Sequence, residues 1–193
     1  MVHPIHLLSL WLEEEKVAGA NYAQHAVLST VDISGKPRAR VVAIRDIQED
    51  KIIFFTQKRT QKVTEINACS AVALTFWFER FQREVIIEGE AGLLSIEDNK
   101  RYWDTYPKWA QLRFCSYAPS SGLAIDNKQI LQNIQLQLEQ KYSNNPVPFS
   151  TDYCGVFVKP RRFVLYAYRL DELSDVWEYE LHGCNWLKRR LSP

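Results

Sequence analysis

RARVVAIRDIQEDKIIFFTQKRTQK, residues 38–62, holds two runs of β-branched and aromatic residues joined by the polar turn Gln48-Glu49-Asp50. Such runs are typical of strands, and they predict one strand at 38–44 and a second at 51–56. Hydroxyl and basic side chains follow the second run, and a short helix is expected to begin near Thr60. The stretch therefore predicts two strands followed by a polar, positively charged corner.

The basic side chains of this corner are Arg38, Arg40, Arg45, Lys58, Arg59 and Lys62. Strand alternation places Arg38 and Arg40 on one face of their strand. Guanidinium forks, hydroxyls and a helix N-terminus are the groups that bind a phosphate monoester. A phosphate site is therefore one interpretation, and a solvated strand edge guarded by charges is another. Nucleic acid is not the expected partner, because the nearby Phe54 and Phe55 belong to an apolar run.

Length and composition indicate a globular chain. The 193 residues fit a single domain over 1–193, and 46% of them are hydrophobic, with a formal net charge of +1. This composition excludes a disordered tail and a protein that binds polyanions through its bulk charge. Any positive patch must therefore be local.

Cysteine and histidine spacing gives no sign of a metal site. The four cysteines form no C-x-x-C pair, which favours reduced thiols. His3, His6 and His25 lack metal-ligand spacing, so we expect no metal. The first apolar run, at 5–12, is interrupted by His6 and followed by glutamates, which fits neither a signal peptide nor a membrane span. We expect a cytoplasmic protein that does not bind membranes.

Hydrophobic periodicity divides the chain into four parts. These are an N-terminal helix at 4–18, a barrel core at 25–94, a helical part at 95–142 and closing strands at 153–193. Strands that follow one another through short polar turns favour an antiparallel barrel or sandwich. The predicted strands lie at 25–31, 38–44, 51–56, 71–78, 84–94, 153–158, 163–168, 176–181 and 186–191.

Helix signals are clearest in the third part. Ser95 is the expected N-cap of a helix that Pro107 ends, and Asp126 is the expected N-cap of a second helix. Tyr117 is expected in the loop between them. The acidic residues between Asp171 and Glu178 are expected to be exposed.

Several motifs in one register carry a family resemblance. They are the hairpin L-S-T-V-D-x-x-G-x-P-x-x-R-V-V, the run F-x-T-x-x-x-T-x-K, the segment G-E-A-x-x-L-S, the loop Ser120-Ser121 and the tail W-x-x-x-R-L-S-P. The chain resembles the pyridoxamine 5′-phosphate oxidase family over about 4–193. The resemblance implies a mainly β fold with flanking helices, an antiparallel six-stranded split barrel that binds FMN. It also implies a homodimer with FMN at the interface.

The resemblance assigns cofactor-binding roles position by position. The implied FMN residues are Arg40, Val41, Val42, Arg45, Phe55, Thr56, Thr60, Gln61, Lys62, Glu84, Ser120 and Tyr166. Arg45 stands where the family usually has lysine, and Gln61 replaces the arginine of an S-R-K turn. Glu84 replaces a glutamine, and Tyr166 replaces a tryptophan. The positions that face the FMN phosphate are mostly retained.

The substrate positions depart further from the family pattern. The implied substrate-binding residues are Arg45, Tyr102, Tyr106, Glu172 and Ser174. Tyr106 and Ala110 replace an arginine and a serine that bind the substrate phosphate in the family. Glu172 and Ser174 replace the arginine and histidine of R-L-H-D, and Val176 replaces the arginine that follows. The resemblance therefore implies a divergent member with a changed substrate site.

Three functions are compatible with these residues. The first is an FMN-dependent oxidoreductase of vitamin B6 type, in which a hydride passes from the substrate to FMN and dioxygen reoxidises the flavin. Its substrate would be a phosphorylated pyridine or another flat amine or alcohol, and no catalytic residue is assigned. The second is a non-catalytic FMN-binding protein, a flavin carrier or sensor. The third is a split barrel that binds nothing redox-active.

Overall fold

The computed structural model describes residues 3–193. Internal contacts divide the chain into two compact units. Unit 1 comprises Met1–Phe54, Glu65–Gly92 and Phe157–Pro193, and unit 2 comprises Phe55–Thr64 and Leu93–Val156. The expectation of one domain over 1–193 stays a prediction. None of the helices in the described chain is long and apolar enough to cross a membrane.

The β-strands form an antiparallel barrel with a hairpin extension. The strands are β1 (His25–Val31), β2 (Pro37–Ile47), β3 (Ile52–Gln57), β4 (Ala71–Phe78), β5 (Arg83–Leu93), β6 (Tyr153–Ala167), β7 (Asp175–His182) and β8 (Asn185–Leu191). Their order is β3-β2-β1-β4-β5-β6-β7-β8, and an additional β3–β6 pairing closes the first six into a ring. The predicted six-stranded antiparallel barrel is confirmed.

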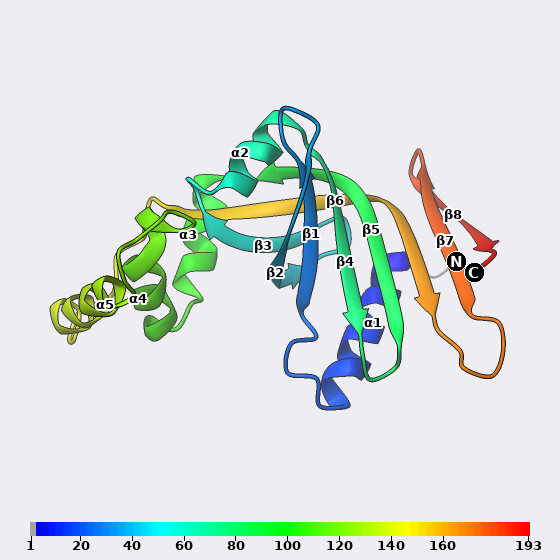
Figure 1. Ribbon diagram of the computed structural model, residues 1–193, viewed down its shortest axis with the longest axis horizontal. Helices are drawn as coiled ribbons and strands as arrows, with labels where there is room; N and C mark the ends of the chain where they lie inside the picture. Colours follow the sequence, from blue (N-terminus) through cyan, green and yellow to red (C-terminus); the bar gives the residue numbers. More distant parts are fainter. Residues whose placement is uncertain (1–2) are drawn as a thin grey trace. The chain divides into compact units, whose positions relative to one another are not determined.

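Alternation along the strands builds the core of unit 1. In β4, Leu74, Phe76 and Phe78 are fully buried, whereas Trp77 between them is exposed. Helix α1 (Pro4–Val17) packs against β4 (Figure 1). Its buried apolar side chains, which include Leu8, contribute to the same core. The predicted N-terminal helix is therefore confirmed.

Unit 2 contains most of the remaining helices. They are α3 (Ile96–Asp104), α4 (Lys108–Tyr117), the 3₁₀ turn η1 (Ala118–Ser120) and α5 (Gln129–Lys141). Helix α2 (Gln61–Ala68) follows β3 near the predicted start at Thr60. The Ser95 side chain accepts a hydrogen bond from the Asp98 amide, as predicted for the N-cap of α3. Trp103 of α3 is fully buried against Leu112 and Phe114 of α4.

Helix α3 ends at Asp104, before Pro107, as predicted. Pro107 is also the N-cap of a helix that was not predicted, α4, where a missing amide hydrogen costs no helical hydrogen bond. Two helix predictions in unit 2 were wrong. Tyr117 is the last residue of α4, not a loop residue. Helix α5 begins after Lys128, and Asn127 rather than Asp126 accepts a bond, from the Ile130 amide.

Two predictions in the closing strands were also wrong. The strands expected at 153–158 and 163–168 form one continuous strand, β6, which runs through Pro160. Gly89 of β5 lies so close to β6 that an added Cβ would lie 2.2 Å from the Lys159 carbonyl oxygen. Glu178 was expected to be exposed, but only 3% of its side chain is accessible. It is buried because Arg162 and Arg189 both bind its carboxylate.

Candidate functional site

Arg40 of β2 lies in a closed ring of polar contacts within unit 1. Arg40 Nη1 donates to Thr30 Oγ1 at 2.5 Å, and Arg40 Nη2 donates to Glu65 Oε2 at 2.7 Å. Thr30 Oγ1 in turn donates to the same Glu65 oxygen at 2.5 Å. Thr30 and Glu65 are buried, whereas the Arg40 side chain remains 21% exposed. The ring therefore fixes a guanidinium that still reaches the surface.

The other predicted residues of β2 lie on both faces of the strand. Val42 is buried in the barrel core, and Val41 is 64% exposed on the outer face. Arg45 is exposed where the register of β2 against β3 shifts between Ile44 and Asp46. Such a bulge changes the direction of a side chain relative to a regular strand. Val42 therefore packs in the core, whereas the side chains of Val41 and Arg45 are exposed.

In unit 2, the segment from Thr56 to Lys62 forms a compact polar group. Lys62 Nζ donates to Thr56 Oγ1 at 3.0 Å, and the hydroxyls of Thr56 and Thr60 lie 3.4 Å apart. Both threonines are buried, and Thr60 directly precedes the first turn of α2. Backbone amides at a helix N-terminus attract anions. Gln61 is exposed at the start of α2 and contributes no charge.

Aromatic side chains surround Phe55 in unit 2. The Phe55 ring stacks on Tyr153 with centroids 4.6 Å apart and also contacts Tyr102 and Tyr106. The predicted cofactor residue Phe55 and the predicted substrate residues Tyr102 and Tyr106 are therefore brought together. Ser120 ends η1, where its hydroxyl donates to the Tyr117 carbonyl at 3.3 Å.

Glu84 and Tyr166 belong to a second aromatic group, in unit 1. Tyr166 stacks on Tyr168 at 4.2 Å, and Trp77 packs edge-on against the same ring. Burial, and then the nearby Glu84 carboxylate, raise the pKa of Tyr168. Tyr168 thus interacts with both of the predicted residues Tyr166 and Glu84. It was missed from the sequence because tyrosine in a strand is ordinary core composition.

The predicted substrate residues Glu172 and Ser174 lie in the connection between β6 and β7. Glu172 is exposed and pairs with Arg169 at 3.6 Å, and Ser174 Oγ accepts from the Arg169 amide at 3.2 Å. Arg169 also pairs with Asp175. This local network fixes the loop without using any predicted cofactor residue.

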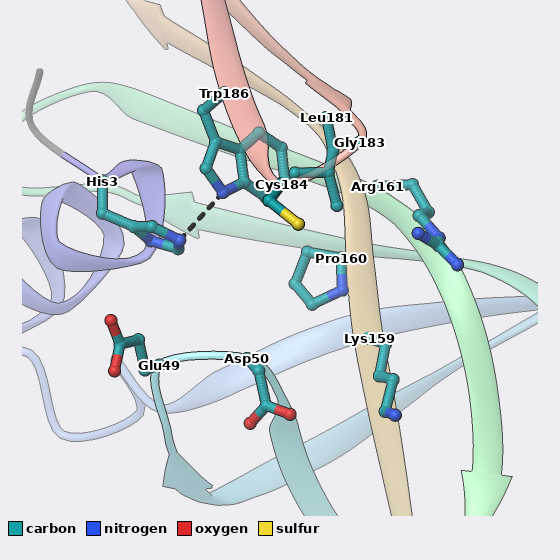
Figure 2. A pocket seen from close by; sticks show the side chains of 10 residues that line it. All are labelled: His3, Glu49, Asp50, Lys159, Pro160, Arg161, Leu181, Gly183, Cys184 and Trp186. Atoms are coloured by element: carbon teal, nitrogen blue, oxygen red, sulfur yellow. Dashed lines mark hydrogen bonds between the residues drawn. The ribbon is translucent and has the colours of Figure 1, made fainter.

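A separate cavity of about 440 Å³ lies in unit 1, between the N-cap of α1, the β2–β3 turn, β6 and the β7–β8 hairpin (Figure 2). Trp186 Nε1 donates to His3 Nε2 across it at 2.8 Å. Burial and the neighbouring His6 lower the pKa of His3, which outweighs the opposing effect of Glu49. None of the predicted site residues is among the residues that line this cavity. We therefore assign it no part in the candidate site.

Comparison with known proteins shows the family to which the chain belongs. A family model described as pyridoxamine 5′-phosphate oxidase matches residues 12–133, which is more than half of the chain. The chain belongs to the pyridoxamine 5′-phosphate oxidase family. A pyridoxine/pyridoxamine 5′-phosphate oxidase from Rubrobacter xylanophilus is 31% identical over 190 residues, 98% of this chain and 87% of the relative. One from a Cyanothece strain is 29% identical over 191 residues, 99% of this chain and 89% of the relative.

Two solved structures share the fold of this chain over nearly its whole length. PhzG from Burkholderia lata, in complex with tetrahydrophenazine-1-carboxylic acid, matches with a TM-score of 0.86 at 22% identity, covering 99% of this chain and 93% of PhzG. A pyridoxamine 5′-phosphate oxidase-related, FMN binding protein from Nostoc punctiforme matches with a TM-score of 0.79 at 18% identity, covering 97% and 96%. The resemblance inferred from the sequence motifs and the split-barrel fold are thereby confirmed.

Two residues of the Arg40 ring were missed from the sequence. Thr30 could have been found, because in the hairpin it pairs with Arg38, the neighbour of Arg40 on the same strand face. Glu65 had no comparable signal, since its contact with Arg40 joins residues 25 positions apart. Two separate donor sets are of the kind that binds a phosphate group. One is the Arg40 fork in unit 1, and the other is Lys62 with two hydroxyls and a helix N-terminus in unit 2.

Proposed function

We propose that the protein is an FMN-dependent oxidoreductase of the pyridoxamine 5′-phosphate oxidase type. The observation that carries this proposal is the polar group of Thr56, Thr60 and Lys62 at the N-terminus of α2 in unit 2, and the fixed Arg40 guanidinium of unit 1 supports it. Charge-assisted hydrogen bonds from a guanidinium and an ammonium group suit the dianionic phosphate of FMN. On the family resemblance we assign Arg45 and Gln61 to the same proposed phosphate site. The full-length similarity to pyridoxine/pyridoxamine 5′-phosphate oxidases supports the same function.

The remaining proposed cofactor residues would orient the flavin ring. FMN, when bound, accepts a hydride from a carbon that bears an amine or alcohol and passes the electrons to dioxygen. Phe55 and Tyr166 offer aromatic surfaces to the ring, and Glu84 and Ser120 offer polar groups to its edge. Because Phe55 contacts Tyr102 and Tyr106, these tyrosines would hold a flat substrate against the same aromatic surface.

The proposed substrate is a flat amine or alcohol whose recognition does not depend on a phosphate. Tyr106 and Ala110 cannot form the charge-assisted bonds of an arginine, each of which is worth about 1.5–3 kcal/mol. Glu172 places a negative charge where the family has a positive one. The Burkholderia lata PhzG structure contains tetrahydrophenazine-1-carboxylic acid, a fused-ring ligand without a phosphate group. An alternative with the same cofactor site is a flavin carrier or sensor without turnover.

An exposed apolar sheet face supports a homodimer. Val27 of β1 and Val41 of β2 are register partners, and they are 38% and 64% exposed. Trp77 of β4 is 53% exposed on the neighbouring strand, and Ala39 and Ala43 are also exposed on β2. A contiguous apolar face on a soluble protein is typical of a protein interface. A second copy of this chain would cover it, with FMN bound at the interface.

Purification followed by absorbance spectroscopy tests the proposed cofactor. We expect a yellow protein that releases FMN on denaturation, or a colourless protein that becomes yellow on reconstitution. A protein that cannot be reconstituted with FMN refutes the proposal. Peroxide formation with pyridoxine phosphate, pyridoxamine phosphate and flat non-phosphorylated amines then separates an oxidase from a carrier, which binds FMN but produces no peroxide with any of them.

The double variant Glu172→Arg with Ser174→His tests the substrate site. It restores the residue types of the family pattern, so peroxide formation with pyridoxamine phosphate should increase. The matched control is Glu139→Gln, which alters an exposed residue of α5. An unchanged activity in the double variant would contradict the assignment of these two positions to the substrate.

A further inference from the structure

Glu65 is a buried carboxylate whose hydrogen bonds serve Arg40. Its side chain is 3% exposed, and both of its donors, Thr30 Oγ1 and Arg40 Nη2, converge on the single oxygen Oε2. The other oxygen, Oε1, is buried without a hydrogen-bond partner in the described chain. A buried carboxylate is costly unless it is paired, and Arg40 supplies the only countercharge that the structure shows for it within residues 3–193.

The same contacts that offset the negative charge of Glu65 also restrict the orientation of the Arg40 guanidinium. Arg40 carries a long side chain with several rotatable bonds, which would be mobile on an open strand face. Contacts from Nη1 to Thr30 and from Nη2 to Glu65 fix both ends of the planar fork. A guanidinium has five N–H donors, and these contacts use two of them. The other N–H groups can face a ligand, because 21% of the Arg40 side chain is exposed.

From this geometry we infer that Glu65 is a positioning residue, which together with Thr30 fixes the Arg40 fork in the orientation that binds the phosphate of FMN. The inference rests on the proposed function. Because the fork is already ordered, it loses little conformational freedom when it binds the phosphate. In this role Glu65 acts through Arg40, which it contacts, and makes no contact of its own with the ligand. It therefore increases affinity for the phosphate group without affecting contacts to the flavin ring.

Two other roles for Glu65 predict different results. If the carboxylate only offset the charge of Arg40, it would compete with the phosphate, and its removal would strengthen FMN binding. If it served only the fold, its removal would weaken the binding of FMN and riboflavin equally, since riboflavin lacks only the phosphate. The ratio of FMN to riboflavin affinity therefore separates positioning from both alternatives.

The experiment measures dissociation constants of the full-length apo-protein for FMN and riboflavin by quenching of flavin fluorescence. In Glu65→Gln we expect FMN binding to weaken about tenfold, the lower end of the loss found when partners that orient metal-binding side chains are removed. Riboflavin binding should change by less than about twofold, because riboflavin has no phosphate for Arg40 to bind. The matched control is Glu90→Gln, which removes an exposed carboxylate paired with Arg161 and should change neither constant.

Two further variants keep the test decisive. Thr30→Val breaks the ring without removing a charge, so it reports on positioning even if Glu65→Gln fails to fold, and it should weaken FMN binding alone. In the Arg40→Gln background, Glu65→Gln should cause no further loss, because the fork that it positions is gone.

Each result has a defined meaning. Unchanged or tighter FMN binding in both Glu65→Gln and Thr30→Val, or equal losses for FMN and riboflavin, overturns the inference while leaving the proposed function intact. Failure of the unaltered protein to bind FMN overturns the proposed function, and the inference with it. A loss confined to FMN in Glu65→Gln or Thr30→Val, absent in Glu90→Gln, supports it.

Discussion

Replacement of Gly155 by alanine should destabilise unit 2 and disturb the proposed flavin strand. An alanine Cβ at this position would lie 2.5 Å from Leu94 Cδ1, 2.7 Å from Phe55 Cε1 and 2.8 Å from Asn99 Oδ1. The Phe55 ring cannot move away freely, because it is stacked on Tyr153. Asn99 cannot either, since its Oδ1 accepts a hydrogen bond from the Gly155 amide at 2.7 Å.

The size of the effect follows from these contacts. Overpacking of a well-packed core costs about 1–3 kcal/mol. Weakening of the buried hydrogen bond between Gly155 and Asn99 adds about 0.5–1.5 kcal/mol. We therefore expect a loss of roughly 2–4 kcal/mol in the free energy of unfolding, which lowers Tm by about 5–15 °C for a chain of this length.

Urea unfolding of Gly155→Ala and of the unaltered protein measures this loss. The control repeats the substitution in a Phe55→Leu background, where the planar ring is absent and the cost should be smaller. A loss below about 0.5 kcal/mol, within the range of ordinary surface substitutions, would refute the steric reasoning. The same cost in both backgrounds would show that Phe55 does not resist the added methyl group. Because the ring of Phe55 is displaced, FMN and riboflavin should both bind more weakly to Gly155→Ala.

Three further predictions address charge and assembly. Lys62→Met removes the ammonium group that donates to the buried Thr56 hydroxyl. Fluorescence quenching should then show FMN binding weakened at least about tenfold and riboflavin binding little changed. Similar losses for both ligands would contradict a contact between Lys62 and the phosphate. Hydrogen bonds from Arg189 and Arg162 hold the pKa of Glu178 below its usual value of 4.5. The ionised carboxylate therefore stabilises the fold above pH 4.5, and this stabilisation is lost as the pH falls through the lower pKa of the native state. In urea unfolding at neutral pH, Glu178→Gln should be less stable than the unaltered protein, and the difference should disappear in acid. A stability difference that does not depend on pH would exclude this cause. Val41→Asp places a charge on the exposed apolar sheet face and should shift sedimentation from dimer to monomer, and an unchanged sedimentation profile would argue against that face as the interface.

The sequence predicted those helices and strands whose ends depend on residues close to one another in the chain. The strand over Ala71–Phe78 was predicted with its observed bounds because alternation and polar turns both indicate it. The Ser95 N-cap was predicted because its partner amide lies in the next turn. Helix α4 was missed because proline indicates both the end and the beginning of a helix, and only packing against α3 separates the two.

Contacts distant in sequence could not be predicted in the same way. Glu178 looked like part of a solvated acidic run, but its partners Arg162 and Arg189 lie on the strands to either side, 16 and 11 residues away. Arg40 was identified through motif resemblance, whereas Glu65, which binds it, was not. A sequence pattern thus indicates which groups are available for binding, and tertiary structure decides which of them are fixed in position.

The closed ring of Thr30, Arg40 and Glu65 has a consequence for how relatives of this protein diverge. Loss of Arg40 alone would leave a buried carboxylate uncompensated, and loss of Glu65 alone would leave a partly buried guanidinium without its countercharge. Each single step lowers stability before any new ligand is gained, so the positions should be replaced together or not at all. Under the proposed site assignment, lineages that change their substrate can therefore alter the exposed loop around Glu172 step by step, whereas the loss of Arg40 as a phosphate-binding group requires a concerted change in the core.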